Sequence, residues 1–490
     1  MKVMLINPPI KYLAYVTADW DRRGDSAGAF PPLGLSYIAG YLVKNTRHDV
    51  VLLDADVEKL SYPEIIARIL EYKPDIVGTT VFTPSFYDSL LLARMVKKNL
   101  PGCYFCVGGI QHVRMFLNET LSHPEIDFAV RGEGEEVFAG LLDALEKKTP
   151  LAAVEGVSFK ENGRIVSAGG EGYIKDINEL PSPAFDLLPV RKYTSAIGTG
   201  APVGTIATSR GCPYECTFCD KPYRTYRSYT TERIISEMEY FYKRGIKEFV
   251  FFDDMFNLTP GRVIEISDVI IEKLPGIIWS FRGRVDQVTE EMLIRAKKAG
   301  CVQIMFGMEA AKNDDLKSIK KRVTTEQFRK SIALCKKAGI ETSSNWIIGL
   351  PCHKSRQDVL DLIDFVIKSN TDYTQFNILV PYAGTELYRE GVKKGILSEN
   401  FWNDYVSNPT PNAYAPYWSE YMSREELSEL LKMCFHKFYL RPSKIIDHVF
   451  KLKSISQFGV KFKGVLYLLG AGGFKRKNAE SYKKEAEAVA

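Results

Sequence analysis

Three closely spaced cysteines are the residues of this 490-residue chain best suited to chemistry: they lie in the segment Cys212-Pro-Tyr-Glu-Cys216-Thr-Phe-Cys219. Three thiolates on one loop can bind three irons of a 4Fe–4S cluster and leave the fourth iron open to a small molecule. The alternatives are buried cysteines clustered by chance, or a zinc site that lacks one ligand. No histidine or further cysteine follows at zinc-finger spacing, so the sequence favours the iron–sulfur cluster.

Alternating apolar strands and helices must position this loop, and the cysteines come directly after the first of these strands. Six such units are too few for a closed eight-stranded barrel, so we predict a partial (βα)6 barrel over residues 196–390. The predicted strands are Val203–Thr208, Glu248–Phe252, Ile277–Phe281, Val302–Gly307, Thr342–Ile348 and Tyr373–Leu379, with helices such as Thr231–Lys243, Pro260–Lys273 and Thr325–Lys337 between them.

Residues 1–150 show the same alternation and predict a separate doubly wound, Rossmann-like parallel sheet, so the fold class is α/β. Residues 151–195 read as a proline-containing linker with a small hairpin, and residues 391–490 as a helical, basic C-terminal region. The predicted N-terminal elements are strands Val3–Ile6, Asp49–Asp54, Asp75–Thr79, Tyr104–Val107 and Asp127–Val130, the last closing the sheet, and helices Pro32–Lys44, Tyr62–Tyr72 and Ser85–Asn99.

With the strand Val203–Thr208, the turn Ser209-Arg210-Gly211 and then the cysteines, the sequence resembles the radical SAM family. The resemblance implies that the open iron binds S-adenosylmethionine (SAM), and that reductive cleavage yields a 5′-deoxyadenosyl radical that abstracts a substrate hydrogen. The reductant would be a protein such as flavodoxin or ferredoxin.

The resemblance also implies SAM-binding residues near the cysteines and at the carboxyl ends of the later strands, where ligands of such barrels bind. An aromatic residue would pack by the adenine, an acid would meet the methionyl amine, an arginine the carboxylate and a glutamate the ribose; a Gly-Leu-Pro turn would lie near the adenine. Polar residues at strand ends also cap helices, which is the alternative for each. The implied residues are, in this order, Phe218, Asp253 beside Asp254, Arg284 beside Asp286, Glu309, and Gly349 with Pro351.

The N-terminal sheet does not carry the motif of a dinucleotide site. Asn7-Pro8-Pro9 follows the first strand where a glycine-rich loop would stand, and proline lacks the N–H that holds phosphate. Glycines recur in Gly132-Glu133-Gly134-Glu135-Glu136, but three acids there would repel a phosphate. These acids are also typical of a helix start.

The domain instead resembles the cobalamin-binding domain of cobalamin-dependent radical SAM enzymes, in the segments 78–85, 107–111 and 127–135. The resemblance implies small hydroxyl residues around the nucleotide tail and a Gly-Gly turn that approaches the corrin closely. The alternative is a domain that binds nothing and only packs on the barrel. The implied cobalamin-binding residues are Thr80, Thr83, Ser85, Gly108, Gly109, Gln111, Gly132 and Glu133.

One departure concerns cobalt: no histidine lies between Asn7 and Phe30, where methionine-synthase-like domains place their cobalt ligand. The lower face of cobalt would then be open or face a residue such as Tyr12 or Tyr15. Two further cysteines, Cys103 and Cys106, have metal-like spacing, but side chains on a strand would diverge there, so we interpret them as structural.

Together the two resemblances imply a cobalamin-dependent radical SAM enzyme, similar to the class B methyltransferases and to the anaerobic magnesium-protoporphyrin cyclase group. The first group implies methylation of an unactivated carbon or a phosphorus centre through the 5′-deoxyadenosyl radical and methylcobalamin. The second implies oxidation or ring closure with the same cofactors. From a different class, a cobalamin or iron–sulfur sensor without turnover is the other alternative.

The net charge of +5 averages two unlike parts. Residues 431–490 hold 13 Lys and Arg against 4 Asp and Glu, whereas the first 430 residues carry 52 against 56. This tail interleaves lysine with apolar residues, which predicts either an interfacial helix that contacts lipid or admits a lipid-like substrate, or a helical cap. The average charge gives little support for a nucleic-acid partner.

The chain has no apolar run of membrane-spanning length and no signal-peptide pattern at its start, so we expect a cytoplasmic protein, peripheral to the membrane at most. Its nine cysteines are then reduced. The substrate is expected to be a small or lipid-like molecule.

Overall fold

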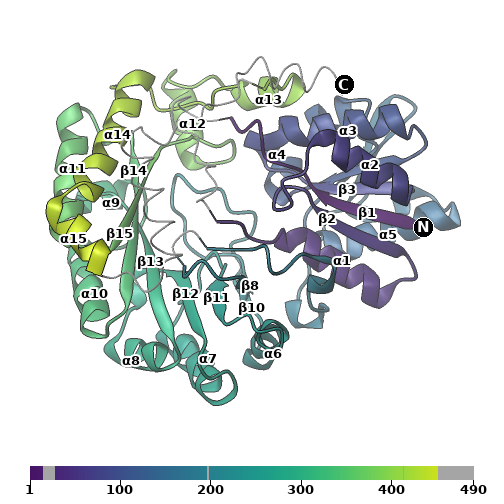
Figure 1. Ribbon diagram of the computed structural model, residues 1–490. Coiled ribbons are helices and arrows are strands. Elements are labelled where there is room, and N and C mark those ends of the chain that lie inside the picture. Colours follow the sequence, from purple (N-terminus) through teal and green to yellow (C-terminus); the bar gives the residue numbers. More distant parts are fainter. Residues whose placement is uncertain (15–27, 196–197, 412, 451–490) are drawn as a thin grey trace.

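The computed structural model describes residues 1–14, 28–195, 198–411 and 413–450. Two largely parallel sheets dominate it, one in the N-terminal part and one in the central part, and C-terminal helices run from one to the other (Figure 1). The α/β fold class with a doubly wound sheet, a partial (βα)6 barrel and C-terminal helices is confirmed.

The N-terminal sheet has the strand order β2-β1-β3-β4-β5-β6-β7. The strand order reverses between β1 and β3, so the connecting helices lie on opposite faces of the sheet on either side of this point. In sheets of this kind, ligands bind outside the carboxyl ends of the strands at the point of reversal. Its elements are β1 (Lys2–Asn7), α1 (Leu33–Asn45), β2 (Asp49–Asp54), α2 (Tyr62–Tyr72), β3 (Ile76–Thr80), η1 (Thr83–Ser85), α3 (Phe86–Asn99), β4 (Tyr104–Gly108), α4 (Ile110–Ser122), β5 (Phe128–Val130) and α5 (Gly134–Lys147).

One prediction about this sheet was wrong, because the strand Asp127–Val130 does not close it. The hairpin strands β6 (Val157–Glu161) and β7 (Arg164–Ser167) continue the sheet antiparallel to β5. Val157 and Phe159 are almost completely buried, so the hairpin adds to the core instead of bridging two domains. The short helices η2 (Leu151–Ala153), η3 (Ile177–Glu179) and η4 (Phe185–Leu187) flank it.

The central sheet is parallel throughout, in the order β15-β14-β13-β12-β11-β8. All six predicted strands form within one to two residues of the predicted bounds. Its strands are β8 (Val203–Ile206), β11 (Glu248–Phe251), β12 (Ile278–Gly283), β13 (Cys301–Glu309), β14 (Glu341–Ile348) and β15 (Tyr373–Ile378), and the pair β9 (Ser209–Arg210) and β10 (Arg227–Ser228) forms a small separate sheet.

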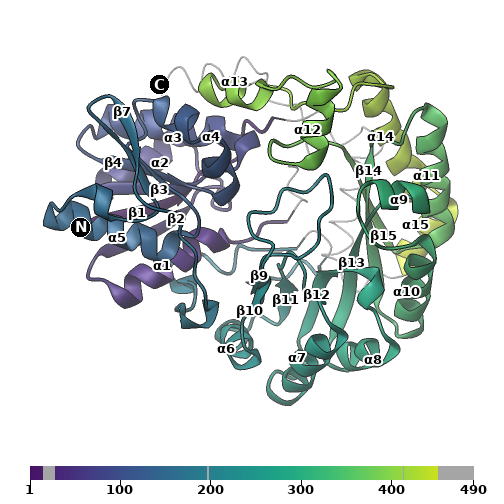
Figure 2. The ribbon, with the colours of Figure 1, turned by 180° about the vertical axis from the view of Figure 1, so that it is seen from behind.

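Aromatic side chains on the convex face of this sheet fix the covering helices, which lie outside the curved sheet in Figures 1 and 2. Trp346, for example, packs between Phe328 and Phe365, with ring centroids 5.5 and 5.8 Å away. The helices are α6 (Thr231–Tyr242), α7 (Pro260–Lys273), η5 (Val285–Gln287), α8 (Glu290–Lys298), α9 (Asn313–Ser318), α10 (Thr325–Lys337) and α11 (Arg356–Ser369).

The C-terminal helices connect the two sheets: α12 (Glu386–Lys393), α13 (Phe401–Ser407), α14 (Arg424–Tyr439) and α15 (Pro442–Phe450). Helix α14 packs on β15, and α13 packs on α4, where His123 Nε2 lies 2.8 Å from the carbonyl oxygen of Val406 (Figure 2). No helix in the described ranges is long and apolar enough to cross a membrane. Residues 451–490, most of the basic tail, lie outside the description.

Candidate functional site

The cysteine loop is held by backbone hydrogen bonds from both sides. Thr217, between the second and third cysteines, donates its N–H to the carbonyl of Ile319 at 3.1 Å and accepts from the N–H of Leu387 at 3.0 Å. Gly211 opens the loop with φ +84°, and a Cβ there would lie 2.3 Å from the carbonyl oxygen of Thr225. The backbone conformation and close packing of this turn therefore require glycine.

The three predicted cluster cysteines are free thiols, and Cys212 and Cys216 lie close enough to Cys219 to influence its pKa. Cys212 is buried, Cys216 is half-buried and Cys219 is exposed, so one side of the group is open. Although Cys219 is exposed as a residue, the protein atoms around its sulfur raise its pKa to about 11 by desolvation, and the neighbouring sulfurs contribute. Three thiols on one loop, with one side of the group open, suit a cluster with one iron left open.

Lys321 contacts three of the predicted SAM-binding residues, namely Glu309, Phe218 and Arg284. Its ammonium lies 3.1 Å from Glu309 Oε1 and 6.0 Å from the centre of the Phe218 ring, and its backbone carbonyl accepts from Arg284 Nη2 at 3.0 Å. Glu309 has φ +73°, which only a constrained site holds in a non-glycine residue. Sequence reasoning missed Lys321, since a basic triplet after a short helix resembles ordinary surface charge.

Arg284 is already engaged by the protein. Its Nε and Nη2 donate to the two carboxylate oxygens of Asp286 at 2.9 and 3.1 Å, and its guanidinium stacks 3.6 Å from the ring centre of Tyr214 in the cysteine loop. These contacts place the Arg284 side chain against the loop where an open iron would lie.

The structure does not bring the other predicted SAM contacts to this group. Asp253 turns inward, accepting from the backbone N–H groups of Thr208 and Ser209 at 2.6 and 2.8 Å, and burial raises its pKa. Its neighbour Asp254 faces a cavity instead. Gly349 and Pro351 lie in the turn after β14, where Gly349 packs against Leu427 of α14.

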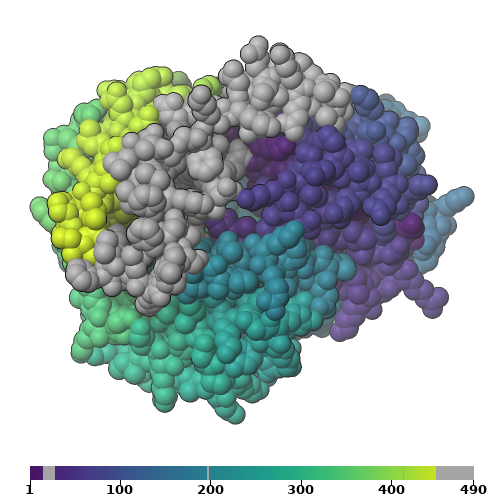
Figure 3. Space-filling model, viewed as in Figure 1, coloured from purple at the N-terminus to yellow at the C-terminus, as the bar shows by residue number. Residues whose placement is uncertain are grey.

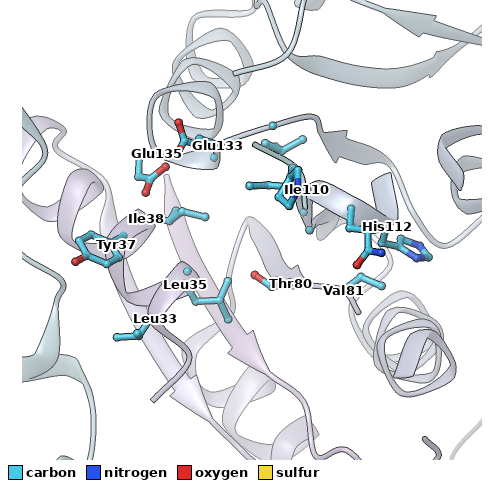
Figure 4. A pocket seen from close by; sticks show the side chains of 18 of the residues that line it. Leu33, Leu35, Tyr37, Ile38, Thr80, Val81, Ile110, His112, Glu133 and Glu135 are labelled. Atoms are coloured by element: carbon cyan, nitrogen blue, oxygen red, sulfur yellow. The ribbon is translucent and has the colours of Figure 1, made fainter. Parts of the chain in front are cut away.

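A cavity of about 480 Å³ lies at the β1/β3 crossover, along the carboxyl edge of the N-terminal sheet. It extends to the cysteine loop, because Arg210, Gly211, Pro222 and Tyr223 also line it. Figure 4 shows its walls: Leu33, Leu35, Tyr37 and Ile38 from α1, Thr80 and Val81 from β3 and the residue after it, Ile110 and His112 from α4, and Glu133 and Glu135.

Two glycines in this wall leave room that the protein itself does not use. A Cβ on Gly34 or Gly108 would meet no atom closer than 4.0 or 3.9 Å, and neither residue has a positive φ. Packing and backbone conformation therefore do not explain glycine there, whereas close approach of a bound ligand does. Thr79 adds a buried hydroxyl on the cavity wall that has no hydrogen-bond partner in the described residues. This cradle fits a large, flat cofactor such as cobalamin.

Seven of the eight predicted cobalamin-binding residues line the cavity, and Ser85 does not. The Ser85 hydroxyl donates to the carbonyl of Phe82 at 3.1 Å and stays within its turn. Five of the seven also have a role within the protein: Thr83 and Glu133, described below, and three more. Gly109 (φ +123°) passes close to the carbonyl of Val81, Gly132 (φ +81°) passes close to Gly172, and Gln111 donates to Asp220 at 2.9 Å.

His112 is a cavity residue that sequence reasoning missed. Its ring nitrogens lie 3.1 and 2.9 Å from the hydroxyls of Thr83 and Thr120, and burial lowers its pKa to about 3. The imidazole is therefore neutral and already engaged at both nitrogens. Tyr12 packs against Tyr87 and does not line the cavity, while Tyr15 lies outside the described residues.

Glu133 joins the N-terminal domain to the strand that precedes the cysteines. It is 4% exposed and accepts from Arg210 Nη1 at 2.8 Å and from Arg227 Nη1 and Nη2 at 2.8 and 2.9 Å. The β9–β10 pairing sets Arg210 beside Arg227, so both guanidinium groups reach one carboxylate. Burial opposes its charge, but the two arginines hold the pKa of Glu133 below its ordinary value.

The comparisons agree with this geometry. Residues 206–366 match the radical SAM superfamily profile, and residues 21–142 match the B12 binding domain profile. The uncharacterised methyltransferase PH0819 of Pyrococcus horikoshii is 34% identical over 461 residues, covering 92% of this chain and 95% of that protein. The chain belongs to the B12-binding radical SAM enzymes.

Two further relatives of this B12-binding radical SAM enzyme are informative. The anaerobic magnesium-protoporphyrin IX monomethyl ester cyclase of Rubrivivax gelatinosus is 28% identical, over 92% of this chain and 80% of that protein. The radical SAM methyltransferase TsrM of Kitasatospora setae, solved with cobalamin and a 4Fe–4S cluster, has the same fold, with a TM-score of 0.67 at 16% identity over 100% of this chain and 98% of that one. The cofactors of the family are a 4Fe–4S cluster, SAM and cobalamin.

Replacing Glu133 with Gln should destabilise the enzyme, because the buried Arg227 guanidinium loses its charged partner and Arg210 keeps only Glu135. We expect the melting temperature to fall by about 5 °C or more. The control Glu136→Gln changes an exposed acid on the same helix and should leave the melting temperature within about 1 °C. Equal melting temperatures for the two variants would show that the ion pairs do not hold the domains together.

Replacing Cys216 with Ala should abolish the visible absorption of the reconstituted cluster and lower bound iron, since two thiolates cannot hold the cube. The control Cys352→Ser changes a half-buried cysteine outside the loop and should keep the wild-type spectrum and iron content. An unchanged spectrum for Cys216→Ala would refute the ligand assignment.

Proposed function

We propose that this enzyme is a cobalamin-dependent radical SAM methyltransferase that acts on an unactivated carbon or a phosphorus centre. The observation that carries the proposal is the shared cavity, which runs from the glycine-lined edge of the N-terminal sheet to Gly211 on the cysteine loop. A substrate in this space would lie between the two cofactor sites. The residues on both sides belong to separate sheets that buried ion pairs hold together.

The protein's own part in this reaction is to bind and orient. The cluster would be held by Cys212, Cys216 and Cys219. The polar groups and the adenine ring of SAM would be bound by Phe218, Glu309, Lys321 and Arg284. When bound, the cluster and SAM supply a hydrogen-abstracting radical, and cobalamin supplies the methyl group, since a substrate radical accepts methyl from a weak cobalt–carbon bond.

On the N-terminal side, Gly34 and Gly108 would admit the corrin ring, and Thr79 and Thr80 would offer hydroxyls to its polar edge. The Glu133 ion pairs would keep the interface closed, which excludes water from a radical reaction. We propose residues 1–150 as the cobalamin-binding unit and residues 196–390 as the unit that holds the cluster and SAM. An electron would come from a carrier such as flavodoxin or ferredoxin.

A second candidate function is oxidative cyclisation. It is favoured by the 28% identity to the Rubrivivax gelatinosus cyclase over most of both chains. The same cavity would serve either reaction, because the two functions differ in whether the substrate radical receives a methyl group or loses an electron.

Counting products separates these candidates. Enzyme reconstituted anaerobically with iron, sulfide, cobalamin and a reductant, then supplied with SAM and candidate substrates, should release S-adenosylhomocysteine and 5′-deoxyadenosine in equal amounts. Deoxyadenosine without S-adenosylhomocysteine would favour cyclisation or oxidation. Neither product, with cluster and cobalamin both bound, would contradict the enzymatic function.

We further propose that the protein is cytoplasmic and contacts anionic membranes through its basic C-terminal region. The 13 basic residues against 4 acidic ones in residues 431–490 support this. Changing Lys451, Lys453, Lys461 and Lys463 together to Gln should reduce co-sedimentation of the full chain with phosphatidylglycerol vesicles but not with phosphatidylcholine vesicles. Equal sedimentation of this variant and the wild type would contradict the proposal.

A further inference from the structure

The residues on the concave face of the barrel sheet can be identified from their neighbours along each strand, which pack under the helices on the convex face. On β12, Trp279 and Phe281 are fully buried among the rings of Phe251 and Phe256, with centroids 5.2 and 4.7 Å apart for the pairs Phe251–Trp279 and Phe256–Phe281. Side chains alternate along a strand, so Arg282 points to the opposite, concave face.

That concave face is polar near the carboxyl ends of the strands. By the same alternation, Asn345 on β14 and Gln375 on β15 face inward, because their neighbours Trp346 and Phe376 pack under the helices. Closed barrels fill these positions with branched apolar side chains. Here water reaches the inner face, since Asn345 is half-buried and Gln375 is exposed, so the inner face is suited to binding a polar ligand.

Arg282 lies where this face meets the cavity. Its guanidinium is 4.9 Å from the ring centre of Phe252, and both Phe252 and Asp254 line the cavity. Water reaches the side chain, yet the surrounding protein lowers the pKa of Arg282, an effect that Asp254 partly offsets. Arg282 is thus an exposed cation beside two residues of the cavity wall, Phe252 and Asp254.

The neighbouring arginines all have partners, and Arg282 lacks them. Arg284 pairs with Asp286, and Arg210 and Arg227 pair with Glu133. Within the described residues, the Arg282 guanidinium has neither a hydrogen bond nor a carboxylate within ion-pair distance. A partly desolvated charge without a partner is unfavourable, and a bound anion would relieve this cost.

The anion at Arg282 could be the carboxylate of SAM or an anionic group of the substrate, and the position of Arg282 distinguishes the two. The carboxylate of SAM must reach the open iron beside the cysteine loop, and Arg284 is the arginine that touches this loop, at Tyr214. Arg282 instead touches Phe252, on the side of the cavity. The anion at Arg282 is therefore best supplied by the substrate.

We propose that the substrate carries an anionic group, a phosphate, phosphonate or carboxylate, and that Arg282 binds it where the barrel's polar inner face meets the cavity. The proposal rests on the proposed function for the presence of a substrate, and it names the class of that substrate. A neutral lipid would leave the guanidinium without a partner.

Equilibrium dialysis of the holoenzyme with radiolabelled inorganic phosphate at low salt tests this. The wild type should bind phosphate, and Arg282→Gln should weaken binding by about tenfold or more. Arg282→Lys keeps the charge and should retain most of the binding. The control Arg356→Gln removes an exposed arginine on α11, which lies on the convex side, and should bind as the wild type does.

A second measurement distinguishes the two sources. SAM added to the reduced cluster should change its electron paramagnetic resonance spectrum equally in the wild type and in Arg282→Gln. Loss of this change in the variant would assign Arg282 to the SAM carboxylate and overturn the proposal. So would the absence of phosphate binding in the wild type, or equal phosphate binding by Arg282→Gln.

These binding measurements need no turnover. Failure of the enzyme to methylate any substrate would therefore contradict the proposed function and leave the anion site standing.

Discussion

The buried contact of Glu133 with Arg210 and Arg227 is the interaction on which the active centre depends. A buried carboxylate is stable only with charged partners, and here both partners come from the small sheet directly before and after the cysteine loop. Their attraction fixes the carboxyl edge of one sheet against the loop of the other. It lies at the boundary between the N-terminal and central parts, which adjoin each other in Figure 3, and the contacts Gln111–Asp220 and Arg210–Glu135 cross the same boundary.

Because the interface is fixed, each side needs little movement to bind its cofactor. The cysteine loop is held at Thr217 by the backbone of Ile319 and Leu387, which belong to different segments of the barrel. On the other side, glycines rather than flexible side chains would make room for the corrin. The site is thus preorganised on both sides, and the substrate would enter a space whose walls are set by two folded units.

The sequence predicted the strands well, because each is a short stretch bounded by turn residues that is either largely apolar, as in Asp49–Asp54, or alternates apolar and polar residues, as in Tyr373–Ile378. It failed where pairing between distant segments decides the structure. The hairpin Val157–Ser167 reads as an independent piece, and only the free edge of β5 makes it part of the sheet. The cysteine spacing was readable because all three cysteines lie on one loop.

The individual contacts were harder to predict. Glu133 and Gln111 stand in the expected motif, yet both contact the barrel domain, since their partners lie about a hundred residues further along the chain. Lys321 and His112 carry no local pattern that separates them from ordinary charged or buried residues. Gly34 could have been noticed from sequence, because a glycine in the first turn of a helix lowers its stability and calls for a reason.

The central claim is that one cavity joins the cobalamin site to the cluster. Cob(II)alamin and the reduced cluster each carry an unpaired electron, so electron paramagnetic resonance of enzyme holding both measures their proximity. Reducing the cluster should accelerate relaxation of the cob(II)alamin signal and split or broaden it. A cob(II)alamin signal that does not change when the cluster is reduced would contradict the central claim.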